Sequence, residues 1–501
     1  MKLLATAHAP EADASKNRQS SLFNPPADKS NFDLALWSSH VALLPLLLGL
    51  VVGACGSHST PALSIDRLVF ITIDTLRADH LPSFGYPIDT APFLESLAKR
   101  SVSFKQAFAH SATTGPSHAS MFTSLYPIQH RVQDNGQKLD KSFVTLAEVL
   151  ADSGYTTAAF VSGNAHFGRS KIAQGFQHYD QPARQSRNNN GKLMLYRPAD
   201  QTTASVIRWF ESRPPGERFF LWVHYYDPHR PLRPPAQYLE DVAPRNRKEM
   251  YQLENFLRRQ HHSDFRLPQQ LQQIISYDAE IRFVDSQIER LFSALHAQEP
   301  GVKTLSIITS DHGQGLANHD WFGHHVHIYN EQLHVPLLFH FSTGHMAGRV
   351  VEDQLVEHVD LPVTILDLLG ETSMSQIDQI QGKSLVPVLV GDPASQHRRF
   401  AFGERRRTYG PVDRQSQEPG ERYALQSLEA KYLWFTEGPD EFYDLRDDPY
   451  ETRDIIDQPS PEKDELQATL INLVAALRSD GQAETVDEET LEKLRALGYL
   501  R

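Results

Sequence analysis

The sequence predicts an α/β fold in which a doubly wound, mixed but mostly parallel sheet is flanked by helices and followed by a smaller C-terminal α+β subdomain. Between about residues 68 and 370, apolar segments of strand type alternate with helical stretches, which is the pattern of a doubly wound sheet. After residue 390 the strand candidates become short and follow one another with turn residues between them. The chain has 501 residues, 40% of them apolar, enough for a large core and two to three domains. We expect boundaries that separate residues 1–64, 65–390, 391–478 and 479–501.

The elements of the main domain follow from apolar runs and from helical spacing. Strands are expected at Leu68–Ile73, Thr157–Ser162, Arg218–Val223 and Thr304–Thr309. Helices are expected at Phe93–Arg100, after Pro116, and at Ser142–Ser153, Thr202–Glu211 and Ile274–Ala297. Residues 184–197 are expected to form an exposed loop, and residues 245–268 a polar insertion rich in helix.

The C-terminal part has a different character. Short strands are expected at Tyr423–Leu428, Lys431–Thr436 and Glu441–Leu445. Leu466–Leu477 and Glu488–Leu497 have the spacing of amphipathic helices, the second of them in the tail of residues 479–501. A small antiparallel subdomain with a helix is therefore predicted for residues 391–478.

Composition excludes some classes of function. The formal charge of −13 argues against a nucleic-acid-binding protein, because such a protein needs a clustered basic face to neutralise phosphates. The single cysteine, Cys55, excludes an intramolecular disulfide framework and a thiolate metal cluster.

The N-terminal segment predicts export. Residues 41–52 form an apolar stretch that is too short to span a bilayer, which takes ~20 residues, but suits the core of a secretion signal. It ends in Val52-Gly53-Ala54-Cys55, which resembles the lipobox of bacterial lipoproteins and implies an acylated Cys55 with residues 56–63 as a flexible tether. We therefore expect a membrane-anchored lipoprotein, periplasmic or on the cell surface. The alternatives are an ordinary cleaved signal or a short buried segment.

Two strand candidates end in residues that bind hard metal ions. Asp74 follows the run that ends at Ile73, and Asp311 and His312 follow the run that ends at Ser310. Thr114 lies on the chain between them. Such residues meet at the carboxyl edge of a parallel sheet, and two carboxylates with one imidazole suit Mn, Zn, Mg or Ca. The alternative is structural: Thr114 caps the following helix and Asp74 simply ends a strand.

Several motifs in this order resemble the sulfatase family of the alkaline phosphatase superfamily. They include Thr114-Gly115-Pro116-Ser117-His118-Ala119-Ser120, the segment from His224 to Pro231, and Phe442-Tyr443-Asp444-Leu445, and the resemblance covers about residues 68 to 455. It implies an alkaline phosphatase-like fold, a catalytic domain over residues 65–390 and a divalent metal ion. The implied ligands are Asp74, Thr114, Asp311 and His312. The implied catalytic residues are Thr114 as nucleophile, His229 as general acid toward the leaving-group oxygen, His118 and His324, and the implied substrate contacts are Asn164, His229 and His324.

The departures from the family pattern favour phosphorus over sulfur. Sulfatases carry Cys or Ser at the position of Thr114, where oxidation gives formylglycine, and Arg at the position of His118; threonine cannot yield that aldehyde. A sulfated threonine cannot expel sulfate to regenerate an aldehyde, so its hydrolysis needs water to attack sulfur. A phosphorylated threonine, by contrast, is readily hydrolysed by metal-bound water.

Pro116 suits the first turn of a helix, whose amino terminus would point at the bound oxyanion.

The expected metal is manganese or zinc, with calcium or magnesium as alternatives. Thr75 stands where many sulfatases have a second ligating Asp, and His312 replaces a frequent Asn, so the site is less hard. A second metal held by Asp227, His229 and His324 is an open alternative.

The leading functional interpretation is an exported, metal-dependent hydrolase of phosphate diesters or phosphonate monoesters. The alternatives are a sulfuric ester hydrolase acting on polysaccharide sulfate and a phosphoryl-group transferase of the cell envelope. The substrate would be a small molecule or an ester of a glycan or lipid, and the sequence gives no oligomeric state. A non-catalytic glycan-binding lipoprotein is disfavoured, since Asp74, Asp311 and His312 are present.

Overall fold

The computed structural model describes residues 64–163, 172–182, 196–261, 267–371, 380–392, 395–406 and 420–478. All of them belong to one compact unit. Cys55, Asn164, nearly all of the expected loop of residues 184–197, and the tail of residues 479–501 lie outside the described residues. In the described part of the chain, no helix is both long and apolar enough to cross a membrane.

The main sheet has the strand order β10-β2-β9-β6-β1-β5-β3-β4, with β11 paired to β2. Its strands are β1 (Arg67–Ile73), β2 (Val102–Phe108), β3 (Thr156–Val161), β4 (His178–Asp180), β5 (Phe219–Tyr225), β6 (Thr304–Ser310), β9 (His334–Phe341), β10 (Arg349–Val351) and β11 (Val356–Glu357). β1 lies at the centre and pairs in parallel with β5 and β6. Every residue of β1 and β5 is buried, as expected for parallel strands covered on both faces. The predicted fold class is confirmed.

The sheet is mixed because of one strand that the sequence analysis did not identify. β9 runs antiparallel to both β6 and β2. A run of apolar residues carries no information about strand direction, and neither β9 nor the strands beyond it, β2, β10 and β11, were foreseen.

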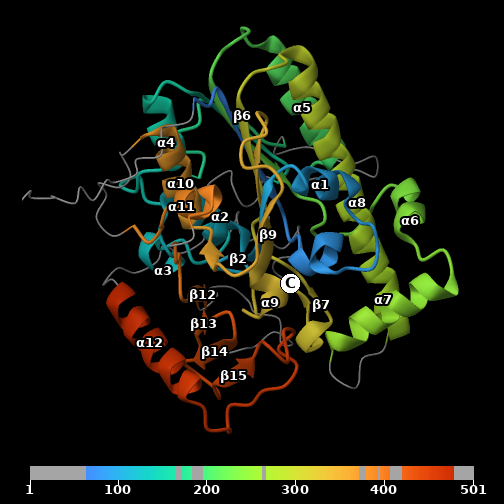
Figure 1. Ribbon diagram of the computed structural model, residues 1–501, viewed down its shortest axis with the longest axis vertical. Coiled ribbons are helices and arrows are strands. Elements are labelled where there is room, and N and C mark those ends of the chain that lie inside the picture. Colours follow the sequence, from blue (N-terminus) through green and yellow to red (C-terminus); the bar gives the residue numbers. More distant parts are fainter. Residues whose placement is uncertain are drawn as a thin grey trace, which may run out of the picture. The chain divides into compact units, whose positions relative to one another are not determined.

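Helices cover both faces of the sheet, as Figure 1 shows. Leu68 and Phe70 of β1 face one core, which also contains residues of α2 (Thr114–Thr123), α4 (Leu146–Asp152), α10 (Asp360–Leu369) and α11 (Val386–Val390). Val69 and Ile71 face the other core, with α1 (Pro92–Ala98), α5 (Ala199–Ser212), α7 (Arg247–Arg259) and α8 (Leu267–Gln298). This alternation along β1 is the period of two that a strand imposes. The remaining α-helices described in the main domain are α3 (Pro127–His130), α6 (Ala236–Val242) and α9 (Asn330–Leu333).

Capping residues set the helix boundaries more precisely than apolar spacing did. α4 begins only at Leu146, because Thr145 caps it: its side chain accepts from the Glu148 amide while the Glu148 carboxylate accepts from the Thr145 amide. The start predicted at Ser142 was therefore about one turn too early. α2 begins at Thr114, so that Pro116 lies inside its first turn.

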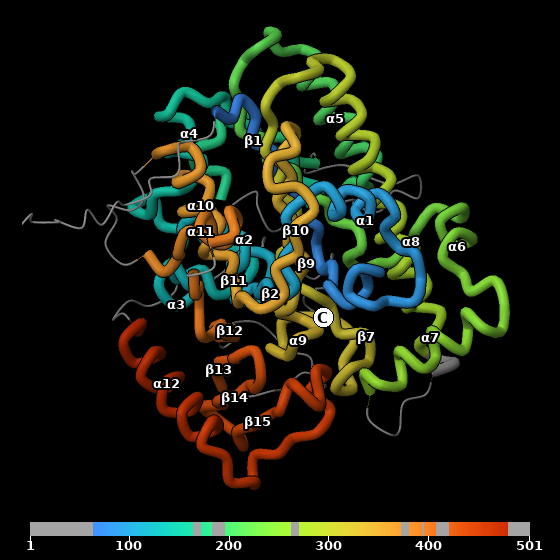
Figure 2. The backbone as a smooth tube through the Cα atoms, in the orientation of Figure 1, coloured from blue at the N-terminus to red at the C-terminus, as the bar shows by residue number. Residues whose placement is uncertain are grey.

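A second, antiparallel sheet forms the C-terminal subdomain, coloured orange to red in Figure 2. It consists of β12 (Ala401–Arg405), β13 (Arg422–Gln426), β14 (Ala430–Phe435) and β15 (Glu441–Asp444), each paired with the next. The helix α12 (Pro461–Leu477) packs Leu466 and Leu470 into a core with Tyr432. The predicted small antiparallel subdomain is confirmed, and β12 adds a strand that was not predicted.

Candidate active site

The carboxyl ends of β1 and β6 bring the predicted acidic residues together. Ile73 pairs with Ser310, so Asp74 and Asp311 leave neighbouring strands at the same level, and both are fully buried. Local bonds fix this edge: Ser310 Oγ lies 2.7 Å from the Ile73 carbonyl oxygen, and the Thr75 amide donates to Asp311 Oδ1 at 3.1 Å. The sheet topology therefore places the two carboxylates side by side.

His312 completes a cluster that fits a divalent cation. One ligand atom from each of Asp74, Asp311 and His312 lies within 4.8 Å of the others. His312 Nδ1 donates to the Gly313 carbonyl oxygen at 2.9 Å, so its Nε2 carries the lone pair, and this Nε2 lies 3.5 Å from Asp311 Oδ2. Two buried carboxylates need positive charge to offset their desolvation. The donor set and its burial thus match a divalent metal ion.

Thr114 reaches the same cluster from the start of α2. Its Oγ1 lies 3.3 Å from His312 Nε2, and the residue is fully buried. Because Nε2 carries the lone pair, the hydroxyl is the donor in this contact. The nucleophile predicted from the sequence therefore lies among the predicted metal ligands.

The first turn of α2 differs from the expectation that it offers donors to an oxyanion. The Gly115 amide donates to Asn135 Oδ1 at 2.7 Å, the Ser117 amide donates to the Thr113 carbonyl at 3.1 Å, and Pro116 has no N–H. These backbone amides already donate to acceptors within the protein, so the expectation that they bind an oxyanion was wrong for them. What α2 provides is the position of the Thr114 hydroxyl.

His118 lies one turn further along α2 and hydrogen-bonds the backbone of Thr114. Its Nδ1 donates to the Thr114 carbonyl oxygen at 2.8 Å, and its Nε2 lies 3.0 Å from Thr72 Oγ1. Burial lowers the pKa of His118 to about 3, so the ring is neutral. With both nitrogens engaged, this geometry suits positioning of Thr114 better than contact with a substrate.

His229 and His324 lie beside the cluster. The ring centroids of His229 and His324 are 4.9 Å apart, and those of His324 and His312 are 4.7 Å apart. His229 Nδ1 donates to the Arg230 carbonyl oxygen, and burial places the pKa of His229 well below its ordinary value. His229 is therefore neutral at rest, with Nε2 as an acceptor, and can act as an acid only after it gains a proton. His324 Nδ1 lies 3.1 Å from Gln314 Oε1.

Asp227 does not join these histidines in a second metal site. Burial raises the pKa of Asp227 to about 7 and that of Glu280 to about 8, and the two carboxyl groups share a hydrogen bond. Over the described residues, neither group of side chains with metal-binding geometry contains Asp227, His229 or His324. The carboxyl pair holds one shared proton near neutral pH, which is how two buried acids avoid mutual repulsion.

Comparison with known proteins identifies the family. The sulfatase family model matches residues 66–371, more than half of the chain. The chain belongs to the sulfatase family. A second model, the C-terminal region of N-sulphoglucosamine sulphohydrolase, matches residues 317–480 and so covers the small subdomain.

Two curated relatives of this sulfatase-family chain have low sequence identity but match it over most of their own length. A Δ4,5-hexuronate-2-O-sulfatase from Bacteroides thetaiotaomicron is 23% identical over 483 residues, covering 89% of this chain and 96% of the relative. A multifunctional alkaline phosphatase superfamily protein from Trinickia caryophylli is also 23% identical, over 79% of this chain and 92% of that protein.

Solved structures of the same fold include a phosphonate monoester hydrolase of Agrobacterium radiobacter. It superposes with a TM-score of 0.65 at 22% identity, covering 84% of this chain and 97% of that one. At this identity the likeness shows the fold alone.

One buried histidine at this sulfatase-family site was missed by the sequence analysis. His224 lies inside β5, where its backbone pairs with Thr72 of β1, and its Nε2 is 3.6 Å from Asp74 Oδ2. It is fully buried. The signal was present in the sequence, since a histidine interrupts the apolar run Phe219–Tyr225, but its relevance depends on β5 lying next to β1.

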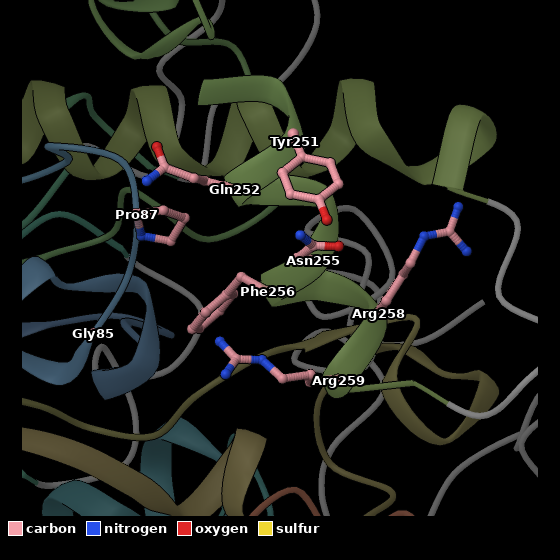
Figure 3. A pocket seen from close by; sticks show the side chains of 8 residues that line it. All are labelled: Gly85, Pro87, Tyr251, Gln252, Asn255, Phe256, Arg258 and Arg259. Carbon is pink, nitrogen blue, oxygen red and sulfur yellow. The ribbon is translucent and has the colours of Figure 1, made fainter. Parts of the chain in front are cut away.

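A separate groove opens between Gly85, Pro87 and the helix α7 (Figure 3). Its volume is 560 Å³, and its rim carries Tyr251, Arg258 and Arg259. Tyr251 is 65% exposed. None of the predicted metal or catalytic residues lines this groove, so it does not bear on the chemistry at Thr114.

Proposed function

We propose that this sulfatase-family chain is a metal-dependent hydrolase that cleaves phosphate diesters or phosphonate monoesters by attack of an unmodified Thr114. The observation that carries the proposal is the position of the Thr114 hydroxyl, 3.3 Å from His312 Nε2 within the buried cluster that also contains Asp74 and Asp311. Thr114 is the first residue of α2 and not its cap, because Thr113 occupies the N-cap position. Its Oγ1 instead contacts a histidine 198 positions away in the chain.

Asp74, Asp311 and His312 would hold the ion, with Thr114 Oγ1 beside them. A bound divalent cation lowers the pKa of a hydroxyl in its shell and stabilises the charge on the oxygens of the reacting phosphorus. Nitrogen from His312 favours manganese or zinc over calcium or magnesium.

The proposed reaction has two steps. Thr114 Oγ1 forms a bond to phosphorus, and the bond from phosphorus to the departing alcohol oxygen breaks. Water then forms a bond to the same phosphorus and releases Thr114. The first step needs one proton removed from Thr114 and one delivered to the alcohol.

His229 and His324 are the residues proposed to move that proton. Because His229 is neutral at rest, it can first accept a proton through Nε2 and then deliver one to the departing oxygen. This sequence replaces the simpler general-acid role inferred from the motif, which requires a protonated histidine from the start.

Hydrolysis of sulfate esters is the second candidate function. It is supported by the names of relatives, among them a hexuronate sulfatase and an N-acetylglucosamine-6-O-sulfatase, both from Bacteroides thetaiotaomicron. Against it stands Thr114, because a threonine cannot be converted to the aldehyde on which the formylglycine route depends. A glycan sulfate is the substrate class that this alternative predicts.

The deciding experiment is a paired assay. The full chain is stripped of metal, reloaded with manganese or zinc, and assayed on a bis-aryl phosphate, an aryl phosphonate and an aryl sulfate with the same aryl group. Faster turnover of the phosphorus esters supports the proposal, and a sulfate rate well above both contradicts it. Thr114→Ala should lower the rate by about 10³-fold or more, as removal of a nucleophile does. Thr114→Ser, which keeps a hydroxyl, is the matched control, used as protein whose intact mass shows no oxidation of the introduced serine to formylglycine.

We also infer that the protein is exported and anchored to a membrane through Cys55, on the basis of Val52-Gly53-Ala54-Cys55 and the apolar stretch before it. Labelling of producing cells with a radioactive fatty acid tests this. The wild type should take up label and Cys55→Ala should not; equal labelling of both contradicts the anchor.

A further inference from the structure

We propose that His224 is a further protein ligand of the divalent ion, through its Nε2 atom. The inference deepens the proposed function, since it rests on a metal ion at the Asp74–Asp311–His312 cluster. Among the side chains that the structure describes, two groups have metal-binding geometry, Asp74–Asp311–His312 and His118–His224–Asp311, and they share Asp311. His224 Nε2 also lies 3.6 Å from Asp74 Oδ2, which connects it to the first group. This separation matches that of the contacts Asp311 Oδ2–His312 Nε2, 3.5 Å, and Thr114 Oγ1–His312 Nε2, 3.3 Å. Ligand atoms about 2.1 Å from a common ion in tetrahedral array are spaced by about this much.

A chain of hydrogen bonds determines which nitrogen of His224 carries the proton. Thr72 Oγ1 lies 3.0 Å from Trp222 Nε1, 2.9 Å from His224 Nδ1 and 3.0 Å from His118 Nε2. A hydroxyl offers one proton and two lone pairs, and the indole nitrogen can only donate. Of the two imidazole nitrogens, one must therefore donate to Thr72 and the other must accept from it.

His118 settles the choice. Its Nδ1 faces the Thr114 carbonyl oxygen, which can only accept, so this nitrogen holds the proton of the neutral ring. Its Nε2 consequently accepts from Thr72, and His224 Nδ1 is left as the donor. His224 is then protonated on Nδ1, and its Nε2 atom presents a lone pair toward Asp74. This is a tautomer of histidine that can bind a metal ion.

The placement also accounts for the missing acidic ligand. Thr75 stands where the resemblance to sulfatases implies a second ligating aspartate. Its hydroxyl donates to the Asp74 carbonyl oxygen at 2.7 Å and its amide donates to Asp311 Oδ1. His224, on the neighbouring strand, offers an imidazole in place of that carboxylate. Two carboxylates balance the charge of a dication, and two imidazoles make the site softer than an all-oxygen site, so zinc and manganese are favoured over calcium.

In this arrangement Thr72 and His118 are positioning residues. They link the orientation of His224 to the carbonyl of Thr114, so one hydrogen-bond chain sets both the ligand and the start of α2. His118 itself is not assigned as a ligand, because its Nδ1 proton is committed to that carbonyl.

The first test counts imidazole ligands in the wild-type full chain loaded with one equivalent of zinc. X-ray absorption at the zinc edge distinguishes one histidine from two by the outer-shell scattering of the imidazole ring. Two imidazoles, His312 and His224, are expected. A spectrum that fits one imidazole overturns the inference while leaving the proposed function in place, and a wild-type protein that binds no stoichiometric ion removes both.

The second test measures zinc affinity by competition with a chelator, with cobalt absorption as a spectroscopic check. His224→Ala should bind zinc about 100-fold more weakly or worse, and Thr72→Val about 10-fold more weakly, as losses of ligand-orienting partners do. Thr309→Val is the matched control, because Thr309 is a buried threonine paired with Thr72 in the sheet whose hydroxyl donates to the Pro336 carbonyl. Zinc affinity of His224→Ala within twofold of the wild type, with an unchanged cobalt spectrum, contradicts the inference.

Discussion

The hydroxyl of Thr114 lies 3.3 Å from Nε2 of His312, although the two residues are 198 positions apart in the chain. A hydrogen bond fixes each residue: His312 Nδ1 donates to the Gly313 carbonyl oxygen, and the Thr114 carbonyl oxygen accepts from His118 Nδ1. A contact fixed at both ends is preorganised, which would spare the hydroxyl a rearrangement in the proposed reaction. This relationship is the basis of the proposed chemistry.

Removal of metal should destabilise the folded protein. Asp74 and Asp311 are fully buried carboxylates, and an ion that binds only the folded state stabilises it by about 2.7 kcal/mol at a hundred times its dissociation constant. The chelated protein should therefore melt several degrees below the zinc-loaded protein in calorimetry. Asp311→Asn should lose most of the difference, and identical melting of loaded and chelated wild type would argue against a metal at this cluster.

Gly313 should not tolerate a side chain. A Cβ atom at this position would lie 2.1 Å from the Glu331 carbonyl oxygen, which is backbone and cannot move aside. Gly313→Ala should cost about 3 kcal/mol or more of unfolding free energy in urea, since overpacking against backbone forces main-chain shifts. Gly154→Ala is the control: it has a positive φ but open space around it, so a cost of about 1 kcal/mol is expected. Equal losses of unfolding free energy in the two variants would show that the close contact with the Glu331 carbonyl does not destabilise Gly313→Ala.

His319 should make stability fall at alkaline pH. Its Nδ1 lies 3.1 Å from Glu331 Oε1 and its Nε2 donates to the Glu451 carbonyl oxygen; burial opposes the charged form, but Glu331 outweighs it and raises the pKa of His319 to about 9. A folded-state pKa above the unfolded value of 6.5 gives stability that is fully present below pH 6.5 and is lost as the pH rises through 9.

The expected loss across that window is at most about 3 kcal/mol. Unfolding free energies at pH 6, 7.5 and 9 measure it. His319→Asn suits the left-handed backbone at this residue, where φ is 48°, and should show a smaller decline than the wild type over the same range. Parallel curves for the two proteins would refute the assignment.

The buried ion pair of Lys431 and Glu451 should be essential to the small subdomain. Lys431 Nζ lies 2.6 Å from Glu451 Oε1 and 3.0 Å from Asn330 Oδ1, and both charged side chains are inaccessible to solvent. Lys431→Met should cost about 3–5 kcal/mol, because it leaves a buried carboxylate without its counter-charge. Arg399→Ala, which breaks the exposed pair with Glu465, should have no resolvable effect in the same denaturation assay. Comparable losses would show that burial of the pair does not matter.

The ends of β1 and β6 could be predicted from the sequence. An apolar run that stops at an acidic residue indicates both the strand and the position of the acid at its carboxyl end. Asp74, Asp311 and His312 could therefore be placed together in advance, and the strand and helix pattern predicted the fold class.

What the sequence could not supply depends on tertiary neighbours. His224 gains its meaning from the pairing of β5 with β1, which puts it opposite Thr72. The direction of β9 follows from its partners, and the neutral state of His229 follows from its burial and from the Arg230 carbonyl. None of these is encoded in local spacing.

Attack by Thr114 is tested most sharply by locating the phosphorus within the first turnover. The zinc-loaded enzyme is mixed with an aryl methylphosphonate, quenched in acid within the first turnover, digested and examined by mass spectrometry, while release of the aryl alcohol is followed in the same samples. Attack by Thr114 should leave a methylphosphonyl group on Thr114 and release a burst of alcohol equal in amount to the enzyme. An unmodified Thr114 peptide together with a linear, burst-free time course would contradict it and indicate direct attack by water.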